Sequence, residues 1–111
     1  MAAQQNLSSI ELMVMLSVIR LGDGAYGVPI SEEIEQTTGT EVLVGSIYAA
    51  LTRLEEKGLV RSEVGEATAE RGGRAKRYFH ATGQGMRAVR EARRALMKLW
   101  TGVSQVEGGK A

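Results

Sequence analysis

Small polar side chains and a run of cations between positions 45 and 77 are the residues best suited to binding a polyanion. A helix with small residues on one face can enter the major groove of a double helix, where side chains read base edges. Cations and hydroxyls beside such a helix can bind phosphates. The candidate base contacts are Ser46, Ala49, Thr52 and Arg53. The candidate phosphate contacts are Tyr48, Lys57, Arg71, Arg74, Lys76 and Arg77, of which the last four surround Gly72 and Gly73.

Charge is divided unevenly along the chain, although its net value is only +1. Residues 1–52 carry one cation against six carboxylates, a net charge of −5. Residues 53–98 carry twelve cations against six carboxylates, a net charge of +6. A face that binds nucleic acid produces such an asymmetry. Cations that are merely solvated beside neighbouring glutamates remain the alternative explanation.

The candidate groove-binding residues lie on a segment, 45–59, that has the period of an amphipathic helix. Its apolar residues Ile47, Leu51 and Leu54 follow the i, i+4, i+7 spacing of one buried face. Gly58 is placed to end the helix in a left-handed cap. The segment is therefore expected to bury one face in a core and to present the other to a partner.

Two strand patterns follow this helix, at 59–64 and 75–81, and a polar, glycine-rich loop separates them. Tyr78 and Phe79 should lie on opposite faces of the second strand, with one of them in the core. The order helix, strand, basic loop, strand is that of a winged helix. The expected fold class is mainly α (α+β), a winged helix-turn-helix with an additional C-terminal helix.

The pattern Y-x-x-L-x-R-L-E-x-x-G-L-V, a glycine-arginine wing and R-Y-F-x-x-T-x-x-G together resemble the PadR family of transcriptional regulators. The matching residues are Tyr48, Leu51, Arg53, Leu54, Glu55, Gly58, Leu59, Gly73, Arg74, Tyr78, Thr82 and Gly85. The resemblance, above all to the short subfamily with one C-terminal helix, implies a DNA-binding homodimer that usually represses transcription. Family members often have serine and proline before the glycine of this helix. Leu43 and Val44 stand there instead, so the usual N-cap is missing.

The first half of the chain is expected to support the groove-binding helix. Ser8 and Glu11 form a capping box, which predicts a helix start. Residues 10–21 are apolar on nearly every side, so one face should pack in the core and the other against a second subunit. The next helix, which contains Pro29, has an acidic outer face unsuited to phosphate. Residues 40–44 form an extended connector that could add a small strand beside the wing.

The last helix should begin at Thr82 as N-cap, although the following glycines, Gly85 among them, weaken its first turn. Apolar residues then recur at alternating intervals of three and four, the heptad seam of a helix that packs on a partner. The predicted dimer interface comprises Val14, Val18, Val89, Ala92, Leu96, Leu99 and Val103. Residues 7–81 are the expected DNA-binding domain and 82–106 the dimerisation helix, with 1–6 and 107–111 disordered.

A small aromatic or hydrophobic effector is implied by the same resemblance, because family members often respond to one. Trp100 lies beside the heptad seam and could stack on a flat ligand between subunits. The candidate ligand contacts are Leu12, Met15, Leu96, Met97 and Trp100, with Val14 as a further first-helix candidate. The alternative is that Trp100 only fills the dimer interface.

Composition excludes several other functions. The 111 residues make one domain, and the absence of cysteine rules out disulfides and thiolate metal sites. His80 is the only histidine, so no metal site, cofactor or catalytic machinery is predicted. Without a membrane span or signal peptide, a cytoplasmic location is expected. The predicted function is a dimeric, sequence-specific transcriptional regulator, and the alternative is a winged-helix adaptor that binds proteins without binding specific DNA.

Overall fold

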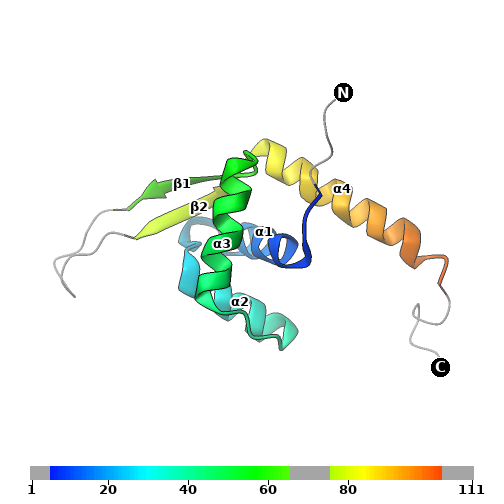
Figure 1. The fold of residues 1–111 in the computed structure, drawn as a ribbon, viewed down its shortest axis with the longest axis horizontal. Helices are drawn as coiled ribbons and strands as arrows, with labels where there is room; N and C mark the ends of the chain where they lie inside the picture. The colour runs from blue at the N-terminus through cyan, green and yellow to red at the C-terminus, as the bar shows by residue number, and fades with distance from the viewer. Residues whose placement is uncertain (1–5, 66–75, 104–111) are drawn as a thin grey trace.

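The computed structural model describes residues 6–65 and 76–103. In chain order the elements are α1 (Ser9–Leu21), the short 3-10 helix η1 (Gly22–Gly24), α2 (Gly27–Thr38), α3 (Val44–Glu56), β1 (Val60–Val64), β2 (Arg77–Ala81) and α4 (Gly83–Trp100). Helices α1 to α3 and the two-stranded sheet form one body, from which α4 extends (Figure 1). The expected winged-helix fold is confirmed.

Helix α1 begins at the capping box that the sequence predicts. The Glu11 amide donates to the Ser8 hydroxyl at 3.1 Å, and the Ser8 amide donates to the Glu11 carboxylate at 2.9 Å. These bonds satisfy N–H groups that a helix start otherwise leaves without partners.

Helix α3 ends as expected and starts without a side-chain cap. The Gly58 amide donates to the Glu55 carbonyl at 3.0 Å, and the Leu59 amide donates to the Leu54 carbonyl at 2.9 Å. With Gly58 at φ +78°, these two bonds make a Schellman motif. At the other end, Leu43 occupies the N-cap and makes no side-chain hydrogen bond.

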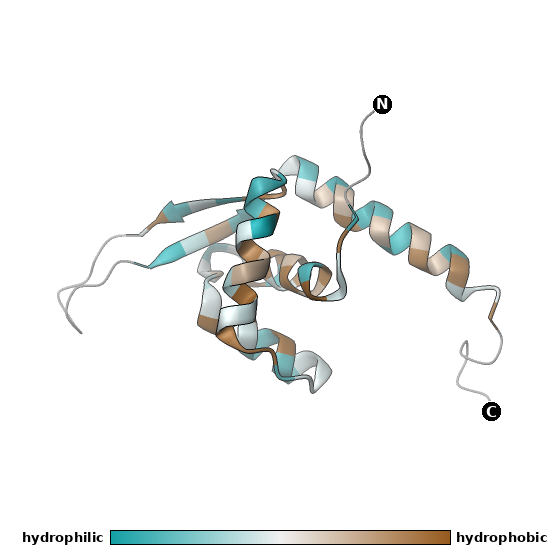
Figure 2. Ribbon diagram, viewed as in Figure 1, coloured by the Kyte–Doolittle hydropathy of each residue, from teal (hydrophilic) through white to brown (hydrophobic). Residues whose placement is uncertain are grey.

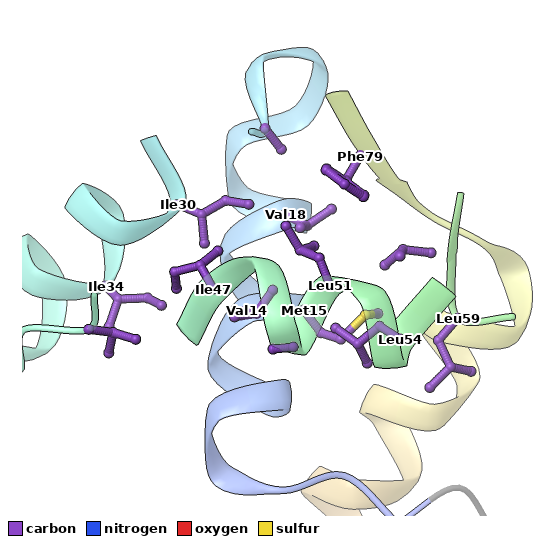
Figure 3. Close-up of a cluster of buried hydrophobic side chains, with 14 of the residues drawn as sticks. Val14, Met15, Val18, Ile30, Ile34, Ile47, Leu51, Leu54, Leu59 and Phe79 are labelled. Atoms are coloured by element: carbon purple, nitrogen blue, oxygen red, sulfur yellow. The ribbon is translucent and has the colours of Figure 1, made fainter. Parts of the chain in front are cut away.

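The hydrophobic core lies between the three helices and the inner face of the sheet (Figure 3). Helix α1 is central, because it contacts α2, α3, α4 and β2. Val14 and Met15 are 0% exposed and Val18 is 2% exposed. The predicted interface role of Val14 and Val18, and the ligand role of Val14 and Met15, are therefore wrong: elements of the same chain already cover these side chains. Among the large apolar side chains of α1, Leu16 faces outward and is 44% exposed.

Strands β1 and β2 pair antiparallel, with Val60 opposite Ala81. Phe79 is buried in the core and Tyr78 is half-buried on the other face, as the alternation predicts. The Phe79 amide also donates to the Ala25 carbonyl at 2.9 Å, which ties the sheet to the start of α2.

The connector before α3 is not a strand, so the expected strand beside the wing is wrong. Val42 turns inward and is 6% exposed. Its carbonyl accepts a hydrogen bond from the Ser31 hydroxyl of α2 at 2.7 Å. Packing against α2 therefore takes the place of pairing with the sheet.

Helix α4 is fixed to the body only through its first turns. The Thr82 hydroxyl accepts from the Gly85 amide at 3.0 Å and donates to the Gly58 carbonyl at 2.7 Å. A Cβ on Gly85 would lie 2.1 Å from the Leu59 carbonyl oxygen, so glycine permits this close approach. Beyond Ala92, every described residue of α4 is exposed. The helix therefore projects from the body with apolar residues along it (Figure 2).

Candidate nucleic-acid interface

Helix α3 has one buried face and one exposed face. Ile47, Leu51 and Leu54 are fully buried against α1 and α2 (Figure 3). The candidate base contacts Ser46, Ala49, Thr52 and Arg53 are all exposed, together with Gly45. The structure therefore brings these four candidates onto one accessible helix, whose small side chains allow another surface to approach closely.

Tyr48 connects α3 to the start of α2. Its hydroxyl accepts a hydrogen bond from the Gly27 amide at 3.3 Å, whereas the N-cap residue of α2, Tyr26, provides no side-chain cap. A Cβ on Gly27 would lie 2.4 Å from the Tyr48 ring, so the ring packs on the bare glycine backbone. Tyr48 is still 40% exposed, and its hydroxyl proton can be donated to a phosphate oxygen.

Arg53 and Lys57 meet at the carboxylate of Glu11, which is 3% exposed. Arg53 Nε lies 2.8 Å from Oε2 of Glu11, and Lys57 Nζ lies 3.1 Å from Oε1. Lys57 also donates to the Asn6 carbonyl at 3.2 Å. The side chains of Arg53 and Lys57 remain 49% and 30% exposed. This cluster joins the start of α1 to the last turns of α3 and holds both cations at the end of the candidate interface.

The environment of Glu11 keeps its carboxylate ionised. Burial by itself raises the pKa of Glu11, but hydrogen bonds from the Ser8 amide, Arg53 and Lys57 outweigh that effect. Together they lower the pKa of Glu11 from 4.5 to about 2. The sequence indicated Glu11 only as a capping residue, because no local pattern reveals partners 42 and 46 positions away.

Lys76 lies at the base of the wing, near the start of α2. Its ammonium is 5.4 Å from the centre of the Tyr26 ring, within the range of a cation–π interaction. The Tyr26 ring in turn packs edge-on against Tyr78, with ring centres 5.5 Å apart. Tyr26 is thus a residue of the candidate interface that sequence reasoning missed, because its partners come from β2 and the residue before it.

Arg77, the neighbouring cation on β2, is directed across the sheet. Its Nη1 donates to the Ser62 hydroxyl at 2.8 Å, and this hydroxyl donates to the Glu55 carboxylate at 2.8 Å. Arg77 therefore lies near the last turn of α3. The other two wing candidates, Arg71 and Arg74, lie outside the described residues.

The end of α4 and the residues that follow it expose a line of apolar side chains. Leu96 is 51% exposed, Leu99 73%, Trp100 50% and Val103 38%. Ala92 is half-buried and Val89 packs partly against the core. A free chain rarely exposes large apolar side chains in such a row, and rows of this kind mark interaction sites.

An open groove of about 310 Å³ runs between the chain before α1 and helix α4. Among the candidate ligand contacts, the groove brings together Leu12 and Leu96. Met97 lies in a separate hollow with Arg90, Arg93 and Arg94, and Trp100 lines neither. Within one chain, the five ligand candidates are therefore not brought together.

Residues 6–65 and 76–103 contain neither a metal-binding cluster nor a helix that could span a membrane. No group of three or more histidine and carboxylate side chains in these ranges could hold a metal ion. His80 lies 3.7 Å from Glu63 at the edge of the sheet. No helix in the same ranges has the length and hydropathy needed to span a membrane.

Several solved structures of regulators have the same fold. A PadR family transcription regulator from Clostridium difficile R20291 aligns with a TM-score of 0.73 at 20% identity, over 91% of this chain and 100% of that one. A transcriptional regulator from Clostridium thermocellum aligns with a TM-score of 0.72 at 21% identity, over 87% and 91%. A PadR family regulator from Eggerthella lenta aligns at 0.68 and 26% identity, over 88% and 83%. A comparison with curated proteins finds no match.

The family itself is established by a match of sequence pattern. The family described as "Transcriptional regulator PadR-like family" matches residues 15–91, which is more than half of the chain. The match includes α2, α3, the sheet and the first half of α4. The chain therefore belongs to the PadR-like family of transcriptional regulators.

Proposed function

We propose that this chain is a homodimeric, sequence-specific DNA-binding protein that represses transcription. The observation that carries the proposal is the division of α3 into a fully buried apolar face and an exposed face of small polar residues, with cations held at its end. In this proposal residues 7–81 bind DNA and residues 82–106 form the dimer.

Helix α3 would enter the major groove, with Ser46, Ala49, Thr52 and Arg53 toward the base edges. The phosphate contacts would be Tyr48, Lys57, Lys76 and Arg77, together with Arg71 and Arg74 in the part of the wing outside the described residues. The exposure of the α3 face and the position of Lys76 at the wing base support this arrangement.

Dimerisation would use the exposed apolar side chains of α4. Two copies related by a twofold axis would present their α3 helices about 34 Å apart, one turn of DNA, and would read a roughly palindromic operator. Leu99→Glu should give a monomer by sedimentation, because Leu99 is the most exposed of these side chains. Val64→Glu, a matched change at a side chain 61% exposed on β1, should leave the dimer intact. A dimer that survives Leu99→Glu would contradict this interface.

DNA binding is tested by titrating the protein into a labelled duplex from its own upstream promoter region, at two salt concentrations. A scrambled duplex of equal length is the control. Lys76→Ala should weaken binding and reduce the slope of log K against log salt by about 0.9, the contribution of one phosphate contact. Lys98→Ala, in the last turn of α4, should leave the slope unchanged. Equal, weak binding of the two duplexes by the unmodified protein would refute the proposed function.

Release from the operator by a planar aromatic or hydrophobic molecule is part of the proposal. The exposure of Trp100, beside Leu96 and Met97 on α4, supports it. Trp100 is the only tryptophan, so its fluorescence reports binding of a panel of planar dyes. If Trp100→Ala leaves both dye binding and operator release unchanged, Trp100 is not part of an effector site.

A protein-binding adaptor is the second candidate function. It is favoured by one observation: Arg20, Arg53, Lys57 and Arg61 are all paired with carboxylates, which weakens the positive field around the body. An adaptor would be insensitive to Lys76→Ala, whereas a DNA-binding protein would lose affinity.

A further inference from the structure

We propose that Glu11 is a positioning residue for DNA recognition, acting through the cations of α3. Its buried carboxylate holds the side chains of Arg53 and Lys57 in the orientation in which α3 presents them to DNA. This inference rests on the proposed DNA-binding function. It assigns to an acidic residue of α1, outside the groove-binding helix, a part in how the operator is distinguished from other sequences.

Glu11 binds Arg53 at the one nitrogen that leaves the end of the guanidinium free. Nε of Arg53 donates to Oε2 at 2.8 Å. In the part of the chain that the structure describes, no hydrogen bond involves Nη1 or Nη2 of Arg53. A guanidinium offers five donors in a rigid plane, so fixing Nε also fixes the direction of the four others. The N–H groups of Nη1 and Nη2 are the donors that bind a guanine edge or a phosphate.

Glu11 holds Lys57 with its other oxygen. Nζ of Lys57 lies 3.1 Å from Oε1 and also donates to the Asn6 carbonyl at 3.2 Å. Lysine has a flexible stem, so two acceptors restrict an ammonium that would otherwise sample many positions. Oε1 is itself fixed by the Ser8 amide at 2.9 Å. The start of α1 thus acts as a rigid support for two solvent-accessible cations at the end of α3.

Charge and positioning make opposite predictions for the removal of this carboxylate. A negative charge beside a DNA-binding surface opposes the approach of phosphates, so its removal should strengthen binding to any duplex. If Glu11 positions Arg53 and Lys57, its removal should instead weaken binding to the operator. Ordering one long side chain at an interface weakens binding by roughly fivefold, so ordering two should reduce operator affinity by roughly 25-fold.

The test uses Glu11→Gln in the full chain, because glutamine keeps the size of glutamate and can keep the capping bond that Oε1 accepts from the Ser8 amide, while it loses the negative charge and the acceptor for Nε of Arg53. Dissociation constants are measured for the promoter duplex and for a scrambled duplex at two salt concentrations. The ratio of the dissociation constant for the scrambled duplex to that for the promoter duplex should fall by roughly fivefold to 25-fold, while affinity for the scrambled duplex stays equal or rises. Glu33→Gln is the matched control: it removes a carboxylate paired with Arg20 at 2.6 Å, and should leave the ratio unchanged.

Repeating Glu11→Gln in a chain that lacks both cations separates a positioning role from a general effect on the fold. In a chain that carries Arg53→Ala and Lys57→Ala, Glu11→Gln should no longer alter the ratio, because the side chains it positions are gone. A ratio that still falls in this background would show that Glu11 acts by another route and would overturn the inference.

The remaining outcomes distinguish this inference from the proposed function. If the unmodified protein prefers the promoter duplex and Glu11→Gln keeps that preference, the inference fails and the function stands. If the unmodified protein has no preference, the function fails and the inference fails with it.

Circular dichroism at the assay temperature establishes whether the Glu11→Gln chain is folded. If it is not, proton exchange at Arg53 Nε is measured by NMR in the unmodified protein bound to the promoter duplex, with Arg53→Lys to assign the signal. Slow exchange in that complex supports the inference. Fast exchange overturns it, because Glu11 then does not hold Arg53.

Discussion

The buried carboxylate of Glu11 should make the stability of this fold depend on pH in a defined direction. The pKa of Glu11 is about 2 in the folded chain, against 4.5 for an unperturbed glutamate. A lowered pKa means that the ionised form stabilises the fold, and that this contribution is complete above pH 4.5 and is lost as the pH falls toward 2. At about 1.4 kcal/mol for each pKa unit, the difference amounts to about 3 kcal/mol. That is a large part of the 5–15 kcal/mol typical of a small domain.

Glu11→Gln tests this value, because glutamine resembles the protonated carboxyl group. Urea unfolding at pH 7 should show a loss of about 3 kcal/mol relative to the unmodified chain, at one fixed protein concentration since dimerisation adds to stability. The loss should shrink toward zero near pH 2, where the carboxyl group of the unmodified chain is also protonated. Urea unfolding of the unmodified chain and of Glu11→Gln, each at pH 7 and near pH 2, therefore measures the contribution of the ionised Glu11 carboxylate to stability.

A matched control is Glu63→Gln, which removes a carboxylate that is 61% exposed and lies 3.5 Å from Arg61. Exposed pairs contribute at most about 1 kcal/mol, so this change should be small at both pH values. A cost of Glu11→Gln below about 1 kcal/mol at pH 7, or a cost that does not change with pH, would show that the ionised Glu11 carboxylate does not stabilise the fold as described.

Three further predictions concern close packing and the core. Gly85→Ala should lower the free energy of unfolding by roughly 1–3 kcal/mol, because the new Cβ meets a backbone oxygen. Gly83→Ala, where the nearest side chain other than its neighbours' would lie 4.0 Å from the new Cβ, should be neutral or stabilising. Equal melting temperatures of these two variants would contradict the prediction. Gly27→Ala should displace the Tyr48 ring and destabilise the fold, measurable as a lower Tm and as changed tyrosine exposure in the ultraviolet spectrum. Leu51→Ala should lower the free energy of unfolding by about 2–5 kcal/mol in urea, since Leu51 is fully buried. A cost below about 1 kcal/mol would show that neighbouring side chains fill the cavity.

The start of α1, the end of α3, the start of α4 and the division of α3 into two faces could be predicted from the sequence, whereas the start of α3, which lacks a side-chain cap, could not. The Ser8 capping box, the Gly58 cap and the Thr82 cap each depend on residues within a few positions of one another. The buried face of α3 follows from helical spacing alone, and strand alternation predicted that Tyr78 and Phe79 lie on opposite faces; only the structure showed that Phe79 is the one in the core. These features could be predicted because all the groups that form each of them lie within a short stretch of the chain.

Tertiary structure alone decided which apolar side chains face inward and which charged groups meet. Helix α1 is apolar on nearly every side, so periodicity could not tell that Val14 and Val18 lie inside and Leu16 outside. The positions of α2, α3 and β2 decide it. The meeting of Glu11 with Arg53 joins residues 42 positions apart. The close approach of Gly85 to the turn after α3 likewise depends on how two helices dock. Contacts between distant segments arise from the packing of the whole chain, and a local pattern does not record them.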